Sequence, residues 1–102
     1  MIRVVETEEF SQEVEQGIVV VDFFATWCPP CKMLEPVLNE LSTEMTQAKF
    51  IKVDIDQSTK LAQKHRVTSV PTVMIFKDGQ AVDSLIGFNP KESITKKISQ
   101  HI

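Results

Sequence analysis

The feature that most constrains this chain is a Cys-x-x-Cys pair placed directly after a buried strand. Cys28 and Cys31 are the only two cysteines. They follow the apolar run 18–24, which is typical of a strand covered on both faces, and they precede a segment with helical periodicity. This order of strand, short turn, dithiol and helix is typical of thiol–disulfide exchange rather than of a structural crosslink.

Size and composition exclude several classes of protein. With 102 residues, the chain has room for one domain with its own core, and we expect a single domain over residues 1–102. The net charge of −3 is modest and the eleven Lys and Arg are scattered, so nucleic acid is not an expected partner. No apolar run approaches the roughly 18 residues of a membrane span. The acidic N-terminal segment lacks a secretory signal, so we expect a protein of the reducing cytoplasm.

The rest of the chain predicts alternating strands and helices. Val4-Val5 suits an edge strand, and further strands are expected at 18–24, 50–55, 72–76 and 81–86. Asp78-Gly79 between the last two strands predicts a hairpin. Helices are expected after each of the first three strands and at the C-terminus. The order βαβαβαββα predicts an α/β fold with a central mixed sheet flanked by helices on both faces.

Several residues mark where these helices begin, bend and end. Thr7, followed by two glutamates, is expected to cap the first helix, which Gly17 ends. Pro36 falls inside the apolar stripe of the second helix, and because the stripe continues beyond it we expect a kink rather than an end. Asn89 is expected to cap the last helix, with Pro90 as its first residue. Ile94, Ile98 and Ile102 form the expected buried stripe of that helix.

The dithiol has the surroundings that a reactive cysteine needs. Cys28 sits where a helix begins, and the free N–H groups and dipole there favour a thiolate. Lys32 adds positive charge nearby. Cys31, one turn in, is expected to be less exposed and to act as the resolving thiol. The alternatives are an inert pair or half of a zinc site, but only two histidines, far apart in sequence, remain as further ligands.

Three other residues are candidates on weaker grounds. Asp22 interrupts an apolar strand, so it either takes up protons for Cys31 with a raised pKa or lies paired or exposed at an edge without a role. Lys52, in the next strand, is either its partner or a solvated lysine. Trp27 either shields the reactive cysteine and offers a flat apolar surface to a partner, or belongs to the core. Local sequence does not establish whether the Val70–Pro71 bond is cis.

Taken together, these motifs resemble the thioredoxin family over nearly the whole chain. The matching segments are 21–33, which contains the dithiol, Pro36, 52–56, Val70-Pro71-Thr72, Lys77-Asp78-Gly79 and Gly87. The resemblance implies a thioredoxin fold and a protein that reduces disulfides in other proteins. It also implies recycling by an NADPH-dependent thioredoxin reductase. No bound cofactor and no metal are expected, and the protein is expected to be a monomer.

The resemblance also assigns roles to individual residues. Cys28 becomes the attacking thiolate, Cys31 the resolving thiol, Asp22 the buried proton acceptor and Lys52 its neighbour. The Val70–Pro71 bond becomes cis and faces the dithiol. The substrate groove is then lined by Trp27, Val70, Pro71 and Gly87.

Two positions depart from the family pattern. Pro29 stands where the family usually has glycine, so Pro29 and Pro30 both lack an N–H and the helix start offers fewer donors to a Cys28 thiolate. We expect this to favour the disulfide and make the protein more reducing. Phe24 stands where tryptophan is more common, which removes an indole N–H. Two alternatives to a general reductase remain: a specialised redox partner of one client enzyme, and a binding module that does not use its thiols.

Overall fold

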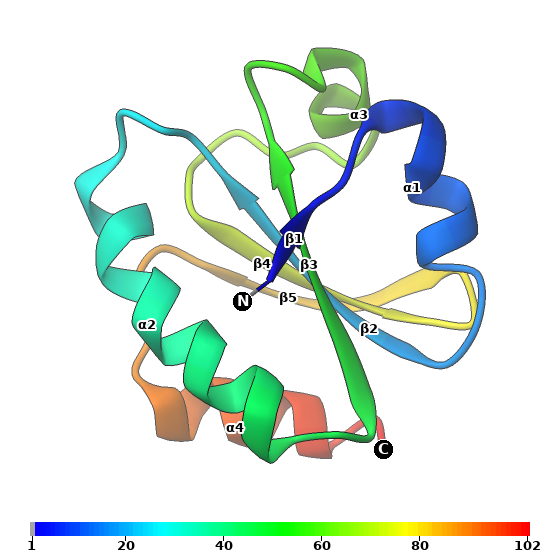
Figure 1. The fold of residues 1–102 in the computed structure, drawn as a ribbon, viewed down its shortest axis with the longest axis vertical. Coiled ribbons are helices and arrows are strands. Elements are labelled where there is room, and N and C mark those ends of the chain that lie inside the picture. The colour runs from blue at the N-terminus through cyan, green and yellow to red at the C-terminus, as the bar shows by residue number, and fades with distance from the viewer. Residues whose placement is uncertain (1) are drawn as a thin grey trace.

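The structure is a computed structural model that describes residues 2–102. Within these residues, five strands form one sheet and four helices cover it (Figure 1). In chain order the elements are β1 (Arg3–Val4), α1 (Thr7–Glu13), β2 (Ile18–Phe24), α2 (Pro29–Glu44), β3 (Ala48–Asp54), α3 (Thr59–Lys64), β4 (Thr72–Lys77), β5 (Gln80–Ile86) and α4 (Lys91–Ser99). The predicted order of elements is confirmed.

The sheet has the strand order β1-β3-β2-β4-β5 and is mixed. β1, β3 and β2 run parallel to one another, whereas β4 is antiparallel to both β2 and β5. β2 is the central strand and pairs along its whole length with β3, in the register that places Asp22 opposite Lys52. The predicted α/β fold with a hairpin at one edge is therefore correct, and its central strand leads directly to the dithiol.

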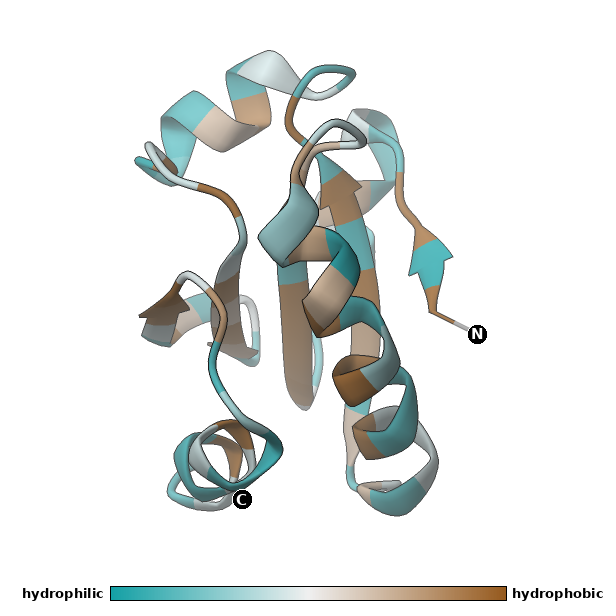
Figure 2. Ribbon diagram, turned by 90° about the vertical axis from the view of Figure 1, so that its left-hand side faces the viewer, coloured by the Kyte–Doolittle hydropathy of each residue, from teal (hydrophilic) through white to brown (hydrophobic). Residues whose placement is uncertain are grey.

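Each face of the sheet has its own core. On one face, Val19, Val21 and Phe23 of β2 pack with side chains of α1 and α3. On the other face, Val20 packs with α2 and α4, whose inward residues are fully buried. Figure 1 shows α2 and α4 on one side of the sheet and α1 and α3 on the other. In Figure 2, the strands are mostly hydrophobic and the helices alternate between hydrophobic and hydrophilic bands, as expected for a sheet covered on both sides.

Several predicted details of the helices and of the hairpin are confirmed. α2 continues through Pro36 rather than ending there. Asp78 and Gly79 connect β4 and β5 with φ of +49° and +88°, the left-handed conformations that a tight hairpin turn of this type requires. Ile94 and Ile98 are completely buried.

Other helix details are corrected. α1 begins after Glu6 rather than with Thr7 as its cap, and it ends at Glu13, well before Gly17. α4 begins after Pro90, which takes the position expected for Asn89. In each case a neighbouring residue has the extended backbone of a cap. Ile102 is 55% exposed because α4 ends at Ser99 and its periodicity stops there.

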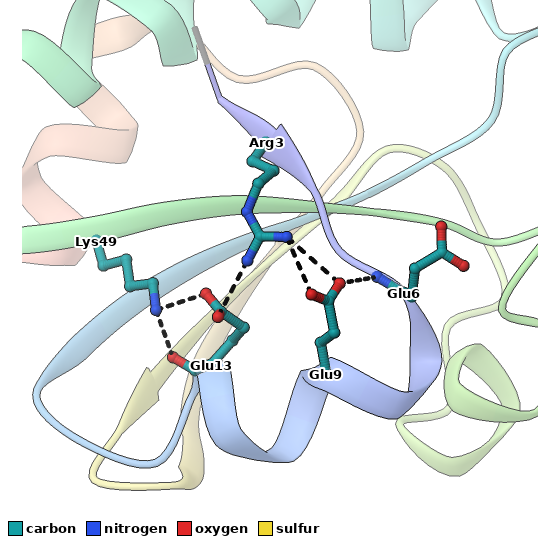
Figure 3. Close-up of polar contacts among 5 residues, drawn as sticks. All are labelled: Arg3, Glu6, Glu9, Glu13 and Lys49. Carbon is teal, nitrogen blue, oxygen red and sulfur yellow. Dashed lines mark hydrogen bonds and ion pairs between the residues drawn. The ribbon is translucent and has the colours of Figure 1, made fainter.

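A group of polar contacts joins β1, α1 and the start of β3 (Figure 3). Arg3 lies 3.3 Å from Glu9 and 3.0 Å from Glu13, and Lys49 Nζ lies 2.6 Å from Glu13. The hydrogen bond from Lys49 is the main reason that the pKa of Glu13 is lowered. The Glu6 N–H donates to the Glu9 carboxylate at 3.1 Å, which satisfies a free donor at the helix start.

None of the helices formed by residues 2–102 is both long and apolar enough to cross a bilayer.

Candidate active site

The two cysteines lie at the junction of β2 and α2 and are joined in a disulfide. Their Cα atoms are 5.3 Å apart. β2 ends at Phe24, a turn follows, and Cys28 takes the N-cap position of α2 with an extended backbone. The strand and the helix thus fix the dithiol from both sides, as the sequence predicts.

The first turn of α2 has few free N–H groups. Pro29 and Pro30 occupy its first two positions and have no N–H to offer. The Cys31 N–H points at the Cys28 sulfur at 3.2 Å. This N–H and the helix dipole are the interactions through which the helix start favours negative charge on Cys28.

Both cysteines are buried in this disulfide form. Cys28 is 3% exposed and Cys31 is 5% exposed, so the expectation that Cys31 is the less exposed of the two is wrong here. The disulfide draws the two sulfurs together, and Ala25 and Val70 pack against them. Cys28 Sγ also lies 3.6 Å from the Val70 carbonyl oxygen.

The loop before β4 forms a second wall beside the dithiol. The Val70–Pro71 bond is cis, as the resemblance implies. The Gly87 N–H donates to the Pro71 carbonyl at 2.7 Å, which ties the end of β5 to this loop. Gly87 has a φ of +80°, a conformation that favours glycine. Three of the four predicted groove residues therefore lie together, and the contact between Cys28 and Val70 places them at the dithiol.

Trp27, the fourth predicted groove residue, is 65% exposed. The alternative that it belongs to the core is therefore wrong. Its indole Nε1–H donates to Asp56 Oδ2 at 2.8 Å, so a residue that follows β3 holds the ring in place. A large, exposed and oriented aromatic ring next to a disulfide is suited to contact a partner protein.

Asp22 is buried beneath the dithiol helix. It is 2% exposed, and it lies on the face of β2 that alternation predicts, with Val20 and opposite Val21 and Phe23. Burial raises the pKa of Asp22 from 3.8 to about 7, although Lys52 lowers it and Glu35 raises it further. Within residues 2–102, its Oδ1 atom has no hydrogen-bond partner. The carboxyl group is thus able to exchange a proton near neutral pH.

Lys52 does not form an ion pair with Asp22, although the two are opposite each other. Its Nζ donates to Glu35 Oε2 at 2.9 Å and lies 4.2 Å from the centroid of the Phe24 ring. The Lys52 side chain is only 12% exposed, so the alternative of a solvated lysine does not hold. Its charge lowers the pKa of Asp22 without an ion pair between the two side chains.

An open pocket of about 240 Å³ lies beside the second cysteine. Its walls come from the end of β2, the turn after it, the first turns of α2, and β3; they are lined by Phe24, Ala25, Thr26, Cys31, Lys32, Glu35 and Lys52. The pocket joins Cys31 to the ion pair of Lys52 and Glu35, and it is large enough to admit water to the sulfur.

Metal ligation was a further alternative for the cysteines. Among residues 2–102, no three His, Cys, Asp or Glu side chains lie close enough together to hold an ion. The two cysteine sulfurs are bonded to each other.

Two residues of this site were missed by sequence reasoning. Glu35 pairs with Lys52, and Asp56 holds Trp27. A signal for Glu35 was present, because it lies four residues after Cys31 on a helix and therefore on the same side. No local signal marked Asp56, because its partner is 29 residues away in the chain.

Comparison with protein families gives a match over almost the whole chain. The model of the family described as Thioredoxin matches residues 1–100. A thioredoxin of Chlamydia trachomatis is 46% identical over 101 residues, which is 99% of each chain. A thioredoxin of Staphylococcus aureus is 45% identical over 95 residues, which is 92% of this chain and 91% of the relative.

Two solved structures that superpose closely on this chain are also thioredoxins. A thioredoxin of Plasmodium falciparum superposes with a TM-score of 0.92 at 36% identity, covering 99% of this chain and 100% of the other. The oxidised form of mitochondrial thioredoxin 3 of Saccharomyces cerevisiae gives a TM-score of 0.89 at 35% identity, covering 98% and 94%.

Proposed function

This chain belongs to the thioredoxin family and is a thiol–disulfide oxidoreductase, and from that premise we propose that Cys28 and Cys31 reduce disulfides in other proteins. The observation that carries this proposal is the disulfide at the N-terminus of α2 above the buried carboxyl group of Asp22, whose Oδ1 has no hydrogen-bond partner among residues 2–102. The reduced form acts on the client, so the disulfide form is the product of one turnover.

The first step is attack on the client disulfide. The Cys28 thiolate, favoured by the Cys31 N–H and the helix dipole, attacks one client sulfur. A bond forms between Cys28 and that sulfur, and the client S–S bond breaks. Its electron pair leaves on the second client sulfur, which takes a proton from solvent. The product is a mixed disulfide between the client and Cys28.

The second step resolves the mixed disulfide. Asp22 accepts the proton of the Cys31 thiol, and the Cys31 thiolate attacks Cys28 Sγ. The Cys28–Cys31 bond forms and the bond from Cys28 to the client breaks. The first client sulfur, which Cys28 had attacked, leaves as a thiolate, so the client is reduced by two electrons and the dithiol is oxidised by two. A carboxyl group with a pKa of about 7 suits this task, because its proton affinity matches neutral pH.

Clients are proposed to bind along the groove formed by Trp27, Val70, Pro71 and Gly87. The Val70 carbonyl lies beside Cys28, which supports a role for this loop in pairing with an extended client segment. Lys52 supports the site through its charge on Asp22, and Pro29 and Pro30 tune the stability of the thiolate.

The family implies a thioredoxin reductase that returns the dithiol to its reduced form. We infer further that this reductase draws on NADPH, and that residues 1–102 act as a monomeric single domain in the cytoplasm. The buried Asp22 with its raised pKa, Lys52 beside it and the cis Val70–Pro71 bond support a catalytic role over a thiol-independent binding module.

The test is NADPH-coupled reduction of insulin with a purified thioredoxin reductase. Turnover that requires both cysteines is the expected result, and its absence with a cognate reductase would contradict a general reductase. A panel of disulfide proteins follows: similar rates support general activity, whereas turnover of a single client supports the specialised alternative.

A further inference from the structure

Glu35 lies one helical turn after Cys31 and reaches across the pocket to β3. The two residues line the same pocket, as residues four apart on a helix share a face. The Glu35 side chain is 54% exposed, whereas its partner Lys52 is only 12% exposed. An exposed carboxylate thus holds a largely buried ammonium group at 2.9 Å.

The position of the Lys52 ammonium group determines whether Asp22 has a charged partner. The two residues are directly opposite in the β2–β3 register, and opposite side chains on neighbouring strands lie on the same face. A lysine in this position has an obvious partner in the buried carboxyl group. Its Nζ is held instead by Glu35 and over the ring of Phe24.

We propose that Glu35 is a positioning residue for the resolving step: it holds Lys52 at the mouth of the pocket and so leaves Asp22 without a cationic partner. The inference rests on the proposed function, in which Asp22 takes the proton of Cys31. Without Glu35, the Lys52 ammonium is free to turn toward Asp22. A cation within about 4–6 Å lowers the pKa of a carboxyl group by about 1–3 units, and the weaker base that results accepts a proton less readily.

The charged and titratable groups that face Asp22 come from two of the described elements. β3 contributes Lys52 and α2 contributes Glu35, and both act on the pKa of Asp22. Lys32 and Cys31, also on α2, line the pocket together with these two residues. On β4 the residue opposite Asp22 is the uncharged Val73, and α4 adds apolar side chains to this face. After burial, the opposing influences of Lys52 and Glu35 set the pKa of Asp22.

The first measurement is an NMR titration of the Asp22 carboxyl carbon in the reduced protein. In Glu35→Gln the midpoint is expected about 1 unit lower than in the parent, at the lower end of the effect of a nearby cation. Glu35→Asp keeps the charge on a shorter side chain and restores part of the shift. The matched control is Glu40→Gln, which removes an equal charge and an ion pair of 2.9 Å with Lys91 from the same helix. It leaves the midpoint unchanged.

The second measurement separates positioning from the direct charge of Glu35. In a Lys52→Met background, Glu35→Gln is expected to shift the Asp22 midpoint much less, because the cation that it releases is gone. Equal shifts in the two backgrounds, or no shift in Glu35→Gln itself, overturn the proposal. Because the Glu35 side chain is exposed, the variant is expected to fold, which circular dichroism checks.

The third measurement is the pH profile of client release from the mixed disulfide on Cys28. In Glu35→Gln, the acid limb is expected to move to lower pH together with the NMR midpoint. At pH values above that limb, client release is expected to be slower than in the parent. A loss of folded protein alone would lower the rate at every pH. Because the titration needs no client, it can fail while client reduction succeeds. Conversely, if the parent protein does not reduce clients, the proposed function is contradicted, whereas the measured effect of Glu35 on the Asp22 midpoint still stands.

Discussion

Asp22 lies opposite Lys52 on the adjacent parallel strand, and yet its Oδ1 atom has no hydrogen-bond partner within residues 2–102. A buried carboxyl group in this state is costly when it is charged, because it has lost hydration without gaining a partner. The cost explains why the pKa of Asp22 is raised to about 7.

Replacing Asp22 with asparagine is expected to stabilise the protein at alkaline pH and to slow resolution. The pKa of Asp22 rises from 3.8 to about 7 on folding, so the folded state binds more protons between these values and stability falls as pH rises through them. Below about pH 4 both states are protonated and the effect vanishes. At about 1.4 kcal/mol per pKa unit, the substitution is expected to raise the free energy of unfolding at pH 8 by roughly 4 kcal/mol. Urea unfolding at pH 4 and pH 8 measures it, and equal gains at the two values would contradict the assignment.

Replacing Cys31 with serine is expected to trap clients. Attack by Cys28 still occurs, but no thiol remains to resolve the mixed disulfide, so an adduct accumulates that dithiothreitol releases. The adduct is seen on a non-reducing gel. Cys28→Ser is the matched control and should form none; adducts of similar yield in both variants would reverse the assigned roles.

Replacing Pro29 with glycine is expected to make the protein less reducing. The change returns an N–H to the first turn of α2, which stabilises the Cys28 thiolate and hence the reduced form. One hydrogen bond of about 1 kcal/mol corresponds to roughly 20 mV for this two-electron couple. Equilibration with glutathione gives the potential of each form. A more negative potential in the variant refutes the argument.

Replacing Trp27 with phenylalanine is expected to weaken client binding more than the chemical step. The variant keeps an aromatic ring but loses the 2.8 Å hydrogen bond to Asp56 that orients it. A loss of about 1 kcal/mol raises the KM for a protein client about fivefold, with kcat nearly unchanged because the sulfurs are untouched. Val82→Ala, which trims another exposed apolar residue near the hairpin end of β5, is the control. A fall in kcat at constant KM would contradict a binding role.

Much of this site was predictable because its signals are local. An apolar run followed by Cys28 and Cys31 places the dithiol at a strand–helix junction, and strict alternation puts Asp22 on the same side of the strand as Val20. Only the structure shows that this side lies under α2. The predicted caps Thr7 and Asn89 were each off by one residue, because the neighbouring Glu6 and Pro90 take the cap positions. The pairing of Lys52 was not predictable from periodicity, since its partner Glu35 is 17 residues away and meets it only after the helix docks on the sheet.

The exposed position of Trp27 has a practical consequence. It is the sole indole in the chain, and the residue after it changes between thiol and disulfide in every turnover. A neighbouring disulfide quenches indole emission, so reduction is expected to brighten the intrinsic fluorescence. The protein thereby carries a built-in optical reporter of its own oxidation state, readable in a stopped-flow cell without dye or label.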